Sequence, residues 1–160
     1  MLTIQQPAGR RREPESIVNA MSENPDQPKR LKVLVAEDEP VSSVMLGDML
    51  ELCGHEPAFA RDGLEAVEAF KNGDFDLVLM DIRMPHLHGI EATRQIRALG
   101  EKSAMVPVIA ITCEPEAFKL VTRDRHDMDG YIGKPYDLDT LKYVIDVTLT
   151  ETGAPELVWK

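Results

Sequence analysis

The chain has 160 residues, of which 43% are hydrophobic and 29% charged, enough for one domain that needs no disulfide or structural metal. Its 28 acidic residues outnumber 18 basic ones, and the formal charge of −10 disfavours direct DNA binding and an anionic membrane surface. Two cysteines make no disulfide framework, and no apolar run is long enough to span a bilayer, so a cytoplasmic protein is expected.

The first 30 residues differ from the rest of the chain. Residues 1–30 contain four prolines, the basic run Arg10–Arg12 and little apolar periodicity, so they are predicted to form a disordered N-terminal arm. Five of them are basic and four acidic, which leaves a charge of −11 on residues 31–160. One domain is expected over residues 31–150, followed by a short C-terminal tail at 151–160.

Beyond the arm, short apolar runs alternate with helical patterns. The apolar runs predict strands over residues 31–36, 57–60, 76–80, 106–112 and 131–132. Residues with helical periodicity predict helices over 41–53, 63–72, 89–99, 115–126 and 137–150. Strands that are apolar throughout are typical of a parallel sheet covered on both faces, so the sequence predicts an α/β fold with helices on either side.

Polar residues lie at the carboxyl ends of four predicted strands. Glu37 and Asp38 follow the first, Asp81 follows the third and Lys134 follows the fifth, while Thr112 is the last residue of the fourth. Ligands of open parallel sheets bind beyond these strand ends, so we expect the five side chains to meet at one edge. Three carboxylates repel one another, and Mg²⁺ would neutralise them. With an ammonium and a hydroxyl beside them, they predict phosphoryl transfer to an aspartate.

Four motifs at these strand ends make the chain resemble the receiver domain of two-component response regulators. They are Ala36–Glu39, Asp81–Pro85 closed by Gly89, Ala110–Thr112 and Tyr131–Pro135, and the resemblance covers about residues 31–150. It implies a flavodoxin-like (βα)5 fold with a doubly wound five-stranded parallel sheet in the order 2-1-3-4-5. It also implies a phosphoacceptor rather than an enzyme. The phosphoryl donor would be the phosphohistidine of a histidine kinase or histidine phosphotransfer protein, and the downstream protein target is unknown.

The resemblance also implies a role for each residue of the metal and phosphorylation site. Asp81 is expected to be phosphorylated. Asp38, Asp81 and the main-chain carbonyl of Arg83 are expected to bind Mg²⁺ directly, and Glu37 through a water molecule.

Three further residues are implied to respond to phosphorylation. Thr112 would hydrogen-bond the phosphoryl group, Lys134 would pair with Asp81 or the phosphoryl oxygens, and Tyr131 would turn inward. The Lys134–Pro135 peptide is expected to be cis, as is usual in the family. From the residues alone, Thr112 could instead end a strand and cap a helix, and Tyr131 could be a static core aromatic.

Residues that flank the site depart from the family pattern or modify it. Cys113 stands where receivers mostly have a very small residue, which would narrow access to the phosphoryl group. The side chains of Arg83 and Glu114 could pair across the site and hinder an attacking water, so at most slow autodephosphorylation is expected.

Two features of the sequence have alternative interpretations. The helix predicted over 41–53 has more apolar residues than one core stripe needs, which fits either a docking surface or ordinary packing. His86 and His88 resemble a metal-binding pair, but no third ligand of that type is near them in sequence.

A stand-alone signalling module is expected, because few residues follow position 150. A receiver cut from a hybrid histidine kinase is the close alternative. The rival from another class is a Mg²⁺-dependent phosphatase with an aspartyl-phosphate intermediate. Phosphatases of the haloacid-dehalogenase type need a second Asp two residues after the nucleophile. That position is Arg83 counting from Asp81 and Pro40 counting from Asp38.

Overall fold

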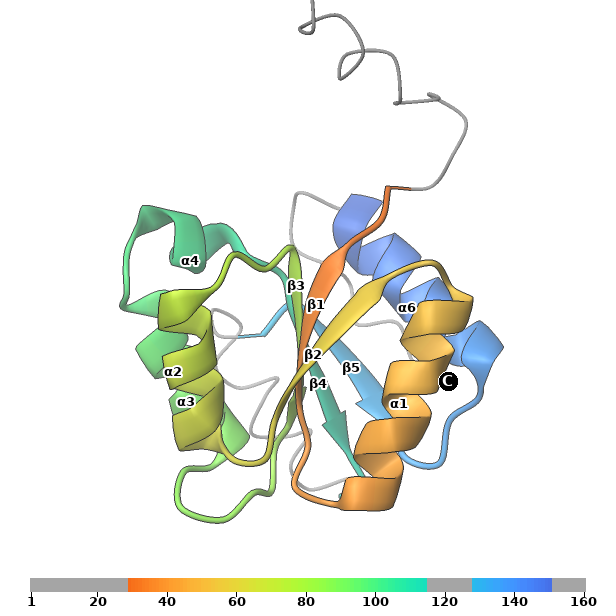
Figure 1. The fold of residues 1–160 in the computed structure, drawn as a ribbon, viewed down its shortest axis with the longest axis horizontal. Coiled ribbons are helices and arrows are strands. Elements are labelled where there is room, and N and C mark those ends of the chain that lie inside the picture. The colour runs from red at the N-terminus through yellow and green to blue at the C-terminus, as the bar shows by residue number, and fades with distance from the viewer. Residues whose placement is uncertain (1–28, 115–127, 151–160) are drawn as a thin grey trace, which may run out of the picture.

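The computed structural model describes residues 29–114 and 128–150, which form one parallel sheet with helices on both faces (Figure 1). The strands are β1 (Lys32–Ala36), β2 (Glu56–Ala60), β3 (Leu77–Asp81), β4 (Val108–Thr112) and β5 (Gly130–Gly133). All four neighbouring pairs are parallel, and the order is β2-β1-β3-β4-β5. The predicted fold class and strand order are therefore confirmed.

The helices cover the sheet in two layers. They are α1 (Pro40–Leu52), α2 (Gly63–Asn72), α3 (Gly89–Arg97), α4 (Glu101–Met105) and α6 (Leu138–Thr150). Helices α1 and α6 lie on one face, and α2 and α3 on the other (Figure 1). No helix in the described part of the chain could cross a membrane. The predicted helix over 115–126, most of the predicted arm and the tail at 151–160 lie outside the described residues.

Between α3 and β4 the structure differs from the sequence-based expectation. The short helix α4 was not predicted, because five residues without a side-chain cap give no periodic signal. Strand β4 begins at Val108 rather than at residue 106. Pro107 has no N–H to offer a ladder, and the carbonyl of Val106 accepts a hydrogen bond from the Arg97 side chain instead.

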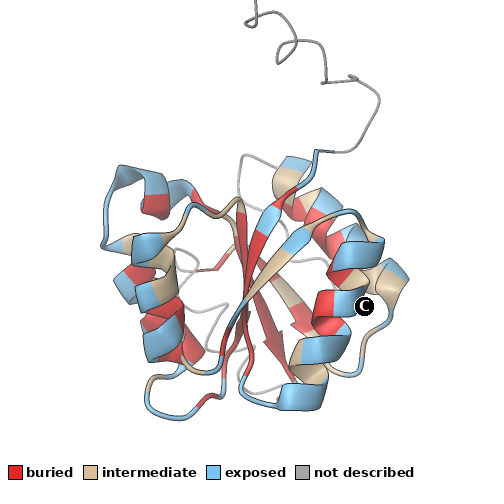
Figure 2. Cartoon of the chain, viewed as in Figure 1, coloured by how far each residue is buried: buried red, intermediate tan, exposed pale blue. Residues whose placement is uncertain are grey.

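The core lies on both sides of the sheet, because side chains alternate along each strand. In β1, Val33 and Val35 pack with the buried residues of α1 and α6, whereas Leu34 and Ala36 pack with those of α2 and α3. Every residue of β3 and β4 is buried (Figure 2). Central strands covered on both faces must be apolar throughout, which explains the continuous apolar runs of the sequence.

Local features of the chain hold the strand ends in place. Residues 37–39 join β1 to α1, and the Glu39 carboxylate caps the helix by accepting hydrogen bonds from the N–H groups of Val41 (3.1 Å) and Ser42 (2.6 Å). At the start of α3, a Cβ on Gly89 would lie 2.1 Å from the carbonyl oxygen of Asp81. Only glycine allows α3 to approach the end of β3 so closely.

Candidate functional site

Three carboxylates gather at the carboxyl ends of β1 and β3. These strands are neighbours with Ala36 opposite Met80, so Glu37 and Asp81 follow at adjacent positions. One oxygen from each of Glu37, Asp38 and Asp81 lies within 4.8 Å of the others. Glu37 and Asp81 are buried, at 3% and 8% exposure, and Asp38 is exposed. This set of hard oxygen donors, open to solvent on one side, fits Mg²⁺.

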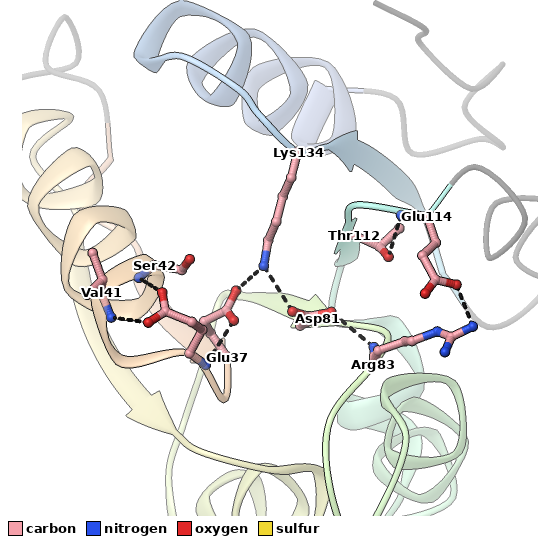
Figure 3. Close-up of polar contacts among 9 residues, drawn as sticks. Glu37, Val41, Ser42, Asp81, Arg83, Thr112, Glu114 and Lys134 are labelled. Atoms are coloured by element: carbon pink, nitrogen blue, oxygen red, sulfur yellow. Dashed lines mark hydrogen bonds and ion pairs between the residues drawn. The ribbon is translucent and has the colours of Figure 1, made fainter.

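Lys134 directly follows β5, the edge strand two places from β3, and its side chain reaches the buried carboxylates (Figure 3). Its Nζ lies 2.5 Å from Glu37 Oε2 and 3.0 Å from Asp81 Oδ2. The peptide between Lys134 and Pro135 is cis, as the family resemblance implied. Burial alone would lower the pKa of the Lys134 ammonium, but hydrogen bonds to the two carboxylates outweigh burial and raise it. Lys134 is therefore held as a cation.

Main-chain N–H groups donate hydrogen bonds to the other carboxylate oxygens of Glu37 and Asp81. The N–H of Glu39 donates to Glu37 Oε1 at 3.1 Å, and the N–H of Arg83 donates to Asp81 Oδ1 at 3.0 Å. Burial raises the pKa of Glu37, and the hydrogen bond from Lys134 opposes that rise. The direct Glu37–Lys134 ion pair was not foreseen, since the resemblance implied only a water-mediated role for Glu37.

Thr112 and Tyr131 lie on the neighbouring strands β4 and β5. Thr112 is buried, its Oγ1 accepts a hydrogen bond from the N–H of Glu114 at 3.2 Å, and its carbonyl accepts one from the N–H of Lys134 at 2.9 Å. Tyr131 is half-buried against the core on the α2 and α3 side. Burial and the nearby Cys113 raise the pKa of the Tyr131 hydroxyl. Cys113 itself is exposed.

An ion pair joins the loops that follow β3 and β4. Arg83 Nη2 lies 2.5 Å from Glu114 Oε2, which confirms the predicted pairing of these two side chains (Figure 3). The Arg83 side chain is 67% exposed and that of Glu114 is 32% exposed. The pair therefore sits at the solvent side of the site, beside Asp81.

The two histidines of the β3–α3 loop do not form a metal centre. Among the described residues, Glu37, Asp38 and Asp81 are the only group of three side chains placed to hold an ion. His86 adopts a positive φ of 64° and its Nδ1 lies 2.7 Å from Asp62 Oδ2, which ties this loop to the start of α2.

Comparisons with known proteins agree with this geometry. The model of the response regulator receiver domain matches residues 33–146. PilH of Pseudomonas aeruginosa is 36% identical over 118 residues, which are 74% of this chain and 97% of PilH. Chemotaxis protein CheY-3 of Vibrio cholerae is 34% identical over 119 residues, 74% of this chain and 91% of that protein. Hybrid signal transduction histidine kinase G of Dictyostelium discoideum is 35% identical over 120 residues, 74% of this chain but only 4% of the kinase.

Solved structures match in the same region. The receiver domain of a sensor histidine kinase from P. aeruginosa superposes with a TM-score of 0.68 at 30% identity, over 77% of this chain and all of that domain. That crystal structure has a magnesium ion coordinated in its active site cleft. Since a family model, full-length relatives and a solved structure all match most of the chain, it belongs to the response regulator receiver domains, the phosphoacceptors of two-component and phosphorelay signalling.

Proposed function

We propose that Asp81 accepts a phosphoryl group from a phosphohistidine on a partner protein. The observation that carries this assignment is the contact between Asp81 Oδ2 and Lys134 Nζ, at 3.0 Å, within a cluster of three carboxylates at the end of a central strand. Glu37 is a poorer candidate, because its side chain is more deeply buried than that of Asp81, at 2% against 10% exposure. Asp38 is exposed, and its position suits a metal ligand better.

The transfer needs one bond to form and one to break. An Asp81 carboxylate oxygen attacks the phosphorus, the P–N bond to the partner's imidazole breaks, and the imidazole leaves with the electron pair of that bond. Lys134 remains protonated and stabilises the negative charge on the phosphoryl oxygens. Because Thr112 Oγ1 accepts the N–H of Glu114, its own proton can be donated to a phosphoryl oxygen.

The carboxylate cluster is proposed to hold Mg²⁺. Asp38, Asp81 and the main-chain carbonyl of Arg83 would bind the ion directly, and Glu37 would act through water. When bound, the ion neutralises charge on the phosphoryl oxygens and on the carboxylates. We expect a dissociation constant on the order of millimolar, which an Asp38→Ala substitution should weaken greatly. An unchanged Mg²⁺ titration of that variant would contradict the ligand set.

The phosphohistidine partner is proposed to dock on the outer face of α1. This face is apolar, with Val41 73% exposed, Val44 63%, Met45 45% and Leu52 77%. The opposite face of the same helix supplies Leu46 and other core residues, so core packing does not account for the exposed apolar side chains. Helix α1 starts beside the carboxylates, so a protein that brings a phosphoryl group to Asp81 must come close to the first turns of this helix.

A substitution on this face separates docking from chemistry. Val44→Asp should slow phosphotransfer from a histidine phosphotransfer protein by at least roughly tenfold, the effect of about 1.4 kcal/mol of lost binding. It should leave phosphorylation by acetyl phosphate unchanged, because a small donor does not need the helix. Equal slowing with both donors would place the defect in the site rather than at the docking surface.

The phosphoacceptor itself is tested with acetyl phosphate and Mg²⁺. Intact-mass measurement should show one added phosphoryl group on the wild-type protein and none on Asp81→Asn. Asp48→Asn, at an exposed position of α1, is the matched control and should label normally. Undiminished labelling of Asp81→Asn would overturn the assignment.

A further inference from the structure

The start of β5 is fixed by a carboxylate at the end of the sheet opposite the site. Asp129 precedes β5, and its Oδ2 accepts hydrogen bonds from the N–H of Val108 and from Arg97 Nη2, both at 2.8 Å. The N–H of Asp129 donates back to the carbonyl of Val108, also at 2.8 Å. Asp129 therefore binds both the N–H and the carbonyl of Val108, the first residue of β4.

Arg97 links the same point to the β3–α3 half of the domain. It lies in the last turn of α3, and its side chain is only 14% exposed. Its Nη1 donates to the carbonyls of Ser103, Ala104 and Val106 at the end of α4. Figure 1 shows α4 near the opposite end of the sheet from the arrowheads of β4 and β5. Arg97 and Asp129 thus join α3, α4, β4 and β5 at one point.

The contacts of Arg97 and Asp129 matter for the alignment of β5, because this strand is short and pairs with β4 only. It has four residues at the edge of the sheet, with Ile109 opposite Gly130 and Thr112 opposite Gly133. A slip of one residue would move Lys134 by about 3.3 Å along the strand and exchange the faces of its neighbours. Lys134 Nζ would then lose its contacts with the carboxylates.

We infer that Arg97 and Asp129 are positioning residues for Lys134 and Thr112, acting through the register of β5 on β4. This inference rests on the proposed function of the site, in which both switch groups face the phosphoryl group. The pair touches neither substrate nor metal. The pair aligns β5 with β4 at the start of both strands. This alignment extends to their carboxyl ends, where the N–H of Lys134 donates a hydrogen bond to the carbonyl of Thr112 at 2.9 Å.

The metal ligands provide an internal reference. Glu37, Asp38 and Asp81 lie at the ends of β1 and β3, which do not depend on the register of β5. Loss of the pair should therefore leave Mg²⁺ binding no weaker than in the wild type, because a displaced Lys134 removes a competing cation from the carboxylates. It should slow phosphorylation by roughly 10- to 100-fold, the usual cost of misplacing a catalytic group by about 1 Å.

The test compares Asp129→Ala with Val67→Ala, a core truncation in α2, which is a helix that packs mainly on β1, β2 and α3. Three quantities are measured: the melting temperature, the Mg²⁺ dissociation constant, and the rate of labelling by acetyl phosphate at saturating Mg²⁺. We expect undiminished Mg²⁺ binding, at least tenfold slower labelling and faster amide exchange in β5 for Asp129→Ala only. Val67→Ala should label at the wild-type rate despite its lower melting temperature.

Arg97→Lys is measured in the same way and keeps the inference testable if Asp129→Ala does not fold. It retains the charge but cannot serve Asp129 and the carbonyls of α4 together, so slower labelling is again expected. Wild-type labelling rates in both folded variants, or a parallel loss of Mg²⁺ binding, would overturn the inference. Failure of the wild-type protein to label would instead overturn the proposed function of Asp81.

Discussion

Replacing Lys134 by alanine tests how strongly its ammonium stabilises the two buried carboxylates. Its Nζ contacts Glu37 at 2.5 Å and Asp81 at 3.0 Å, and these carboxylates are 3% and 8% exposed. Breaking a buried ion pair from one side typically costs about 3–5 kcal/mol. Glu37 can take up a proton once the lysine is gone, since burial already raises its pKa, so we expect the lower end, about 3 kcal/mol. For a domain of this size that lowers Tm by roughly 10 °C.

Urea denaturation monitored by circular dichroism measures this loss. The control is Lys102→Ala, which removes an ion pair of 2.5 Å between side chains that are 77% and 86% exposed and should leave the midpoint nearly unchanged. Mg²⁺ at about ten times its dissociation constant should restore about 1.4 kcal/mol to the Lys134 variant. The deficit should also shrink as the pH falls, because protonation of Glu37 removes one of the uncompensated charges. Equal urea midpoints for the two lysine variants would refute the reasoning.

Three further outcomes are expected. Burial lowers the pKa of His55, and the charge of Asp146 opposes this effect. The neutral imidazole is therefore favoured in the folded state, and the free energy of unfolding should fall as the pH falls below about 6.5. Thermal melts of a His55→Gln variant should show a smaller change of stability between pH 7 and pH 5. Glu114→Ala frees Arg83 from the ion pair beside the site, and the half-life of the phosphorylated protein should shorten several-fold when followed by phosphate release. Beryllofluoride with Mg²⁺, which mimics the phosphoryl group, should change the backbone amide chemical shifts of residues 112–143. Changes limited to the neighbours of Asp81 would show that phosphorylation does not alter the surface formed by residues 112–143.

Apart from α4, the order of the described strands and helices along the chain and the clustering of the site residues could be predicted from the sequence. Apolar runs without alternation indicate central strands covered on both faces, and parallel strands bring their carboxyl ends to a single edge. Glu37, Asp38 and Asp81 therefore had to lie together once β1 and β3 were neighbours. The position of a charged residue directly after an apolar strand was enough to predict the cluster.

Other features depended on contacts that no local pattern contains. Helix α1 is apolar on several sides, so its periodicity could not show which side faces the core, and only the packed structure revealed Val41 and Leu52 as exposed. Asp129 and Arg97 are separated by 32 residues, and neither differs in sequence from an ordinary surface charge. The register of β5 follows from those distant contacts rather than from its four residues, because an edge strand this short offers too few side chains to specify its own alignment.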